Sequence, residues 1–153
     1  MPRKSSPANV SAPSVQTRIH ILRGYRIVLD IDLAELYGVT TSRLNEQIKR
    51  NLERFPNDFM FVLSDQEVAN LRSQFAIASW GGRRTNPYAF TEHGAVMAAT
   101  ILSSPVAIQA SILIVRAFIA MREMISEQAD LKKRMISLEQ RVAKGFTEHA
   151  QEL

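Results

Sequence analysis

One stretch, residues 30–55 (DIDLAELYGVTTSRLNEQIKRNLERF), constrains the fold most, because it has the pattern of two short helices joined by a tight turn. Asp32 is placed to cap the first helix, with Glu35 at the capping-box position three residues later. Gly38 then stands where a helix commonly ends in a left-handed residue. A short support helix, a glycine turn and a second helix are typical of a helix-turn-helix.

The second helix of this unit is predicted to begin after Thr40 or Thr41, either of which can cap it, and to end before Pro56. Its apolar residues recur at helical spacing, and the opposite side is polar and basic. The apolar set is Leu44, Ile48 and Leu52. The candidate DNA contacts from this segment are Thr40, Thr41, Ser42, Arg43, Asn45, Glu46, Lys49 and Arg50.

These side chains predict distinct kinds of contact with duplex DNA. Asn45 is of the type that reads adenine, and Arg43 or Arg50 can read guanine or hold a phosphate. Hydroxyl and backbone N–H groups around residues 40–42 can hold a phosphate oxygen at the helix start. The alternative is an ordinary helical hairpin, and Glu46 weakens phosphate attraction.

Short apolar runs on both sides of this unit predict a small sheet. Residues 19–22 and 25–29 surround Gly24 as a hairpin would, and residues 59–63 form a further buried strand. Another strand follows at residues 88–90.

The loop before that last strand has the sequence GGRRTNP and resembles the tip of a wing. Arg83 and Arg84 follow the two glycines, so they are candidates to contact phosphate or enter a minor groove. The alternative for this segment is a solvated basic hairpin.

Three further helix starts carry cap signals. Ser64 with Glu67 forms a capping box, Thr91 precedes a helix over residues 92–102, and Ser104 precedes Pro105. The helix from Pro105 to about residue 126 is the most apolar part of the chain. It is short for a membrane span and is interrupted by polar residues, which predicts a buried core helix. The interrupting residues are Gln109, Ser111 and Arg116.

From residue 121 onward, apolar residues alternate at spacings of three and four, with Gln128 as the one polar position. This seam predicts a coiled coil and therefore a homo-oligomer, with a dimer favoured. A single amphipathic helix packing on its own domain is the alternative. The residues predicted to mediate oligomerisation are Met124, Leu131, Met135, Leu138 and Val142.

Composition limits the classes of function. The 153 residues are 46% hydrophobic and 22% charged with a net charge of +4, as in a globular protein with a mild preference for polyanions. The chain has no cysteine, and its three histidines lack metal-ligand spacing, so we expect no metal or other cofactor and no enzymatic activity. No secretory signal opens the sequence, and we expect a cytoplasmic protein with a disordered basic tail over residues 1–18.

Longer motifs give a family resemblance over roughly residues 19–124. The runs RNLERFPNDFMF and PYAFTEHG resemble the phage-type KilA-N DNA-binding domains, in the branch named for the N-terminal part of viral open reading frame six. Members of that branch are common in phage and prophage antirepressor-like proteins. The resemblance implies sequence-directed binding of double-stranded DNA and no catalysis. By position, it marks residues 41–54, including Arg54, and the loop with Arg83 and Arg84 as the DNA-facing parts.

The chain departs from that family pattern in two places. His93 stands where we associate glutamine, and a helical tail stands where related antirepressors often carry a second domain.

We therefore predict an α+β, winged-helix-like domain over residues 19–124, followed by an oligomerising helix over residues 125–153. The predicted function is that of a phage-type transcriptional regulator binding double-stranded DNA. The alternative is a protein-interaction module that binds a partner protein through its C-terminal helix. We expect no association with a membrane.

Overall fold

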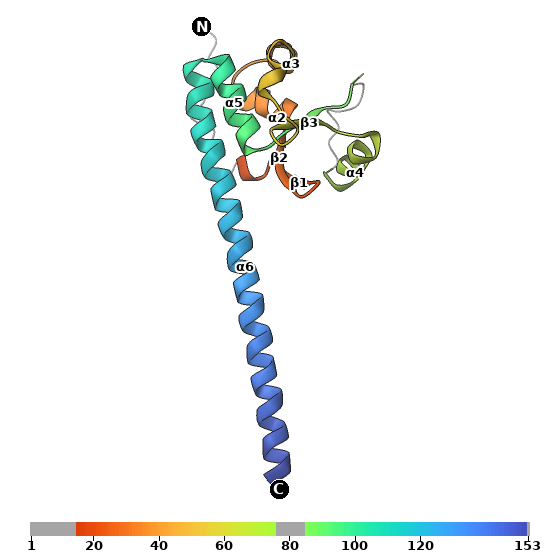
Figure 1. Ribbon diagram of the computed structural model, residues 1–153, viewed down its shortest axis with the longest axis vertical. Coiled ribbons are helices and arrows are strands. Elements are labelled where there is room, and N and C mark those ends of the chain that lie inside the picture. The colour runs from red at the N-terminus through yellow and green to blue at the C-terminus, as the bar shows by residue number, and fades with distance from the viewer. Residues whose placement is uncertain (1–14, 76–84, 153) are drawn as a thin grey trace. The chain divides into compact units, whose positions relative to one another are not determined.

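The computed structural model describes residues 15–75 and 85–152 and confirms the α+β class (Figure 1). Contacts divide the chain into two units, Met1–Phe118 and Ile119–Leu153, and the first contains the sheet. The described elements are β1 (Ile19–Leu22), β2 (Tyr25–Leu29), α2 (Asp30–Leu36), α3 (Thr41–Arg50), the 3-10 helix η2 (Leu52–Arg54), β3 (Met60–Val62), α4 (Asp65–Phe75), β4 (Tyr88–Phe90), α5 (Glu92–Leu102) and α6 (Pro105–Glu152).

The four described strands form one antiparallel sheet in the order β1-β2-β4-β3. The predicted β1–β2 hairpin is confirmed, and its turn is formed by Arg23 (φ 53°) and Gly24 (φ 80°). Two successive residues with positive φ match the right-handed twist of the paired strands. β2 continues the sheet by pairing with β4, where Val28 lies opposite Phe90.

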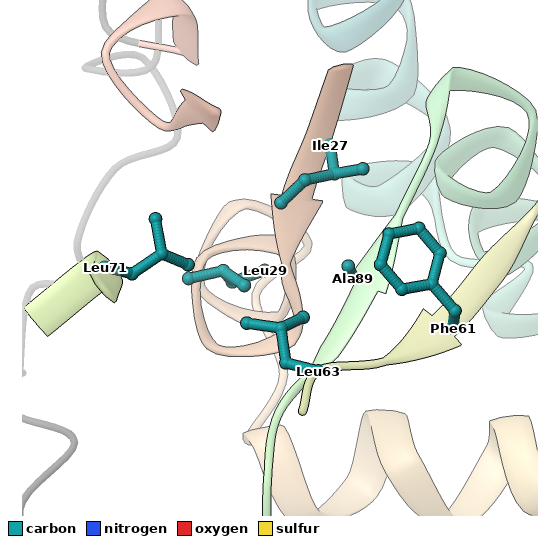
Figure 2. Close-up of a cluster of buried hydrophobic side chains, with 6 residues drawn as sticks. All are labelled: Ile27, Leu29, Phe61, Leu63, Leu71 and Ala89. Atoms are coloured by element: carbon teal, nitrogen blue, oxygen red, sulfur yellow. The ribbon is translucent and has the colours of Figure 1, made fainter. Parts of the chain in front are cut away.

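Both faces of the central strand β2 are covered, which explains its unbroken apolar run. Successive side chains of a strand point to opposite faces. On one face, Ile27 and Leu29 join a buried cluster with side chains from β3, β4 and α4, as Figure 2 shows. Val28 and Phe90 lie on the other face and are fully buried. The other members of the cluster are Phe61, Leu63, Leu71 and Ala89.

The predicted caps of α4, α5 and α6 are confirmed. In α4, the Ser64 Oγ accepts from the Glu67 N–H at 3.2 Å, and a Glu67 carboxylate oxygen accepts from the Ser64 N–H at 2.8 Å. The Thr91 Oγ1 accepts from the Gly94 N–H at the start of α5. The Ser104 Oγ accepts from the Ala107 N–H at 3.1 Å. Each of these groups satisfies a backbone donor that the helix itself leaves free.

The predicted cap of α2 is wrong. The helix begins at Asp30, two residues before Asp32, and its N-cap residue Leu29 makes no side-chain cap bond. The chain passes directly from the buried end of β2 into α2, so burial of Leu29 and Asp30 decides the start.

The second helix of the central unit is shorter than predicted. α3 ends at Arg50, and a separate 3-10 turn covers Leu52 to Arg54. Leu44 and Ile48 are buried as expected, but the side chain of Leu52 is 51% exposed. The change of helix type at Asn51 rotates Leu52 away from the buried side.

The last helix differs from the prediction in length and in burial. α6 continues without interruption to Glu152 instead of ending near residue 126. In its first turns, one side is buried and the other carries exposed apolar side chains such as Ile108 and Ile112, so it is not a fully buried core helix. The buried side consists of Ala107, Ala110, Ile114, Ala117 and Phe118.

One helical segment of the described chain, Pro105–Phe146, is long and apolar enough to span a membrane by length and composition alone. Its qualifying window has a mean hydropathy of 1.5 and is 28% buried. Such a helix is weak evidence for a span, because helices of soluble proteins with one packed side pass the same test. The expectation of no membrane association stays a prediction.

Candidate nucleic-acid interface

The turn before α3 fixes where that helix begins. Gly38 has φ 72°, the left-handed conformation predicted for it, and a Cβ at this position would also lie 3.3 Å from a methyl group of Val106. The Thr40 Oγ1 then accepts from the Arg43 N–H at 3.1 Å, which confirms Thr40 as the cap. The first turn of α3, whose earliest N–H groups have no partner within the helix, therefore starts directly after an exposed threonine.

α3 has one buried and one exposed side. It packs through Leu44 and Ile48, and it contacts α2 and α5. Exposed charged residues occur on α3 and on η2, which follows it, and more of them are basic than acidic. The exposed charged residues of α3 and η2 are Arg43, Glu46, Lys49, Arg50, Glu53 and Arg54. We call these six residues, with the exposed Thr40 and Ser42, the α3 face.

Within the α3 face, Arg43 and Arg50 stand seven residues apart, which places them on the same side of the helix two turns apart. Arg50 forms an ion pair with Glu46 at 2.7 Å, and both side chains are more than half exposed. Exposed pairs of this kind contribute at most about 1 kcal/mol. Arg50 can therefore exchange Glu46 for a phosphate or a base edge at small cost.

Asn45, by contrast, faces inward. Its Nδ2 donates to the Asp30 carboxylate at 3.1 Å, and its Oδ1 is buried with no hydrogen-bond partner among the described residues. The side chain that we predicted to read adenine is therefore committed to the interior in this structure. Thr41, the other candidate with reduced access, is half-buried.

Sequence reasoning missed Asp30, whose side chain holds α3 in place. It is fully buried, and its carboxylate also accepts from the Tyr88 N–H of β4 at 3.3 Å. One carboxylate thus joins β4 to α3 through Asn45 and fixes the helix on the sheet. Its only sequence signal is an acidic residue placed directly after the apolar run of β2.

Two of the predicted DNA contacts, Arg83 and Arg84, lie outside the described residues. Arg54 is exposed on η2, next to the end of α3. The expectation that a basic loop and the second helix share one surface therefore stays a prediction.

Within residues 15–75 and 85–152, no group of three or more His, Cys, Asp or Glu side chains has a metal-binding arrangement. His93, the residue that departs from the family pattern, stacks on Phe59 with ring centroids 5.6 Å apart and planes at 21°. Its ring is used in packing at the start of α5.

Asp32 is a partly buried carboxyl near the start of α2. Burial raises its pKa to about 6, the nearby Arg18 opposes this rise, and Glu35 and Asp30 add to it. The folded protein therefore binds a proton here more tightly than the unfolded chain does, so this group's contribution to stability is greatest below pH 4. The contribution falls as the pH rises from about 4 to about 6.

We expect Asp32→Asn to be more stable than the wild type at pH 7, by about 1–2 kcal/mol, because an amide removes the cost of burying a charge. At pH 4 the difference should be small. Urea unfolding at both pH values measures it, with the exposed Asp130→Asn as control. A variant no more stable than wild type at pH 7 would show that Asp32 carries no such cost.

Most of the first unit matches a known family of protein domains. The ORF6N domain matches residues 17–101, which is more than half of the sequence. The chain belongs to the ORF6N domain family. This family is phage-associated. The match runs from the β-hairpin through most of α5, includes the α3 face, and leaves α6 outside. No curated protein and no solved structure matches the chain.

Proposed function

We propose that this ORF6N protein binds double-stranded DNA through the α3 face and acts as a phage-type transcriptional regulator. The observation that carries the proposal is the α3 face itself, in which a capped helix start is followed by four basic and two acidic exposed side chains on α3 and η2. An α-helix fits the major groove, and arginine and lysine supply both phosphate and base contacts. The phage-associated ORF6N family supports the same reading. The resemblance of the sequence motifs to KilA-N domains also supports it.

The α3 face offers separate groups for positioning and for reading sequence. Arg43 and Arg50 are the candidates to contact guanine, since both are exposed and lie on one side of the helix. Lys49 and Arg54 are the candidates to contact phosphates. Thr40 and Ser42 are exposed at the helix start, where hydroxyl and N–H groups hold a phosphate oxygen. Arg83 and Arg84 would add contacts from their loop.

The first test is selection of bound duplexes from a random pool, followed by affinity measurements on the selected site. Arg50→Ala should weaken binding by about 1–3 kcal/mol and relax the preference at one base position. Lys49→Ala should weaken binding to selected and unrelated duplexes alike. Lys133→Ala removes an equal charge from α6 and serves as the matched control.

Two results would contradict this proposal. One is a selection that returns no enriched sequence and no binding at low salt. The other is unchanged affinity for Arg43→Ala, Lys49→Ala and Arg50→Ala on the selected site, which would place the DNA contacts elsewhere on the protein.

A second function, binding of a partner protein through the C-terminal helix, is favoured by the exposed apolar residues of α6. Capture of a repressor by α6 would make the protein antirepressor-like. The variants above separate the two functions, because loss of charge on α3 would leave binding of such a partner intact.

A further inference from the structure

The second unit of the chain, Ile119–Leu153, is a single stretch of helix with a row of uncovered apolar side chains. Five large residues of the predicted seam are between 49% and 60% exposed. A helix gains most of its stability by burying its apolar side, so a row of this length requires a partner. The five residues are Met124, Leu131, Met135, Leu138 and Val142.

These residues occupy the two core positions of a heptad repeat. Met121, Gln128, Met135 and Val142 repeat every seven residues and take position a, and Met124, Leu131 and Leu138 take position d. Leucine at d is typical of two-stranded coils, and a single polar residue at a fixes the register. In register, the Gln128 amides of two copies meet each other, whereas a shift by one heptad places each amide against apolar side chains.

The charges beside the seam indicate the relative direction of the two helices. Glu127 and Arg134 take position g, and Lys132 and Glu139 take position e. In a parallel pair, each g residue lies next to the e residue of the following heptad in the other helix. Glu127 then meets Lys132 of the second copy, and Arg134 meets its Glu139, so both contacts join opposite charges.

An antiparallel pair places g beside g and e beside e. In the antiparallel register that pairs Leu131 with Met135, Arg134 then meets Arg134 of the second copy, which is a repulsive contact. The charge pattern is therefore complementary in the parallel arrangement and partly opposed in the antiparallel one.

We propose that residues 121–142 form a parallel, in-register, two-stranded coiled coil with a second copy of this chain. Its core is the a and d residues above, Gln128 sets the register, and the Glu127–Lys132 and Arg134–Glu139 pairs set the direction. The two copies of the first unit are then attached at the same end of the coil. This inference rests on the second unit alone and stands whether or not the α3 face binds DNA.

The first test uses the absence of cysteine from the 153-residue sequence. Leu131→Cys and Leu138→Cys, made separately, should each form an interchain disulfide on mild oxidation, because identical d residues face each other only in a parallel in-register pair. Lys133→Cys, on the outer side of the helix, is the matched control and should stay monomeric on a non-reducing gel. Failure of both d variants to cross-link overturns the proposal.

The second test uses charge reversal and sedimentation equilibrium of the full chain. Wild type should sediment as a dimer, and Glu139→Lys should raise the dissociation constant about fivefold or more, because it places the introduced lysine beside Arg134 twice in each dimer. Adding Arg134→Glu should restore the affinity. In an antiparallel pair Lys132 would face residue 139 instead, and Arg134→Glu would give no rescue. Absence of rescue, a monomer at all concentrations or a trimer each contradicts the proposal.

Discussion

Gly94→Ala is expected to destabilise the first unit by about 3 kcal/mol or more, because the added methyl group has no space. Gly94 is buried in the first turn of α5, and a Cβ there would lie 1.8 Å from the Phe59 carbonyl oxygen and 2.7 Å from its carbon. The clash is with backbone, so no rotation of a side chain relieves it. The Phe59 carbonyl is also held in place, since it accepts from the Thr91 N–H at 3.0 Å.

Thermal or urea unfolding followed by circular dichroism measures this effect. Gly145→Ala is the matched control, because a Cβ at Gly145 meets no atom within 4 Å and alanine favours a helix by about 1 kcal/mol over glycine. The control should unfold at the same denaturant concentration as wild type, or a higher one. If Gly94→Ala proves as stable as this control, the close approach of α5 to the backbone of Phe59, in the turn before β3, is wrong.

Asp30→Ala is expected to cost about 2–4 kcal/mol, because it removes a buried carboxylate that accepts hydrogen bonds from β4 and α3. The Asn45 amide and the Tyr88 N–H would both lose the carboxylate that pairs them. Since Asn45 lies on α3, the variant should also loosen this helix on the sheet, and faster hydrogen exchange should appear at Leu44 and Ile48.

Urea unfolding and hydrogen exchange test this prediction together. Asp65→Ala is a suitable control, because Asp65 is an exposed carboxylate that accepts from Asn86 at 2.8 Å and its loss should cost less than 1 kcal/mol, roughly the value of an exposed hydrogen bond. Equal destabilisation by the two variants would contradict the role of Asp30 as the joint between β4 and α3.

The parts of the fold that the sequence predicted well depend on neighbours along the chain. Thr40, Ser64 and Thr91 each cap a helix through a backbone N–H three residues away, so the pattern alone carries the information. The hairpin turn at Gly24 and the left-handed Gly38 are local in the same way.

The predictions that failed concern features that depend on contacts between residues far apart in sequence. Asn45 and Arg43 are two residues apart and both polar, and only the Asp30 carboxylate, fifteen residues earlier, turns Asn45 inward. The start of α2 follows burial at the end of β2, which outweighed the cap signal at Asp32. Leu52 kept its helical spacing in sequence, but α3 had already ended at Arg50.

In α6, one part of the helix was predicted well from the sequence and another part was not. The spacing of three and four predicted a seam from residue 121, and the described side chains there are exposed as a free seam requires. The upstream residues Ala107, Ala110, Ile114 and Ala117 continue the same spacing, yet they are buried in the first unit. Spacing identifies an apolar side of a helix, but tertiary packing decides what covers it.

The salt dependence of duplex binding shows whether the α3 face contacts DNA, because removing one phosphate-binding charge reduces the slope of log K against log salt by about 0.9. We expect Lys49→Ala and Arg54→Ala each to lower this slope by about that amount on the same duplex, and Lys133→Ala to leave it unchanged. If the slope is the same for wild type and for the Lys49→Ala, Arg54→Ala double variant, the α3 face does not contact DNA.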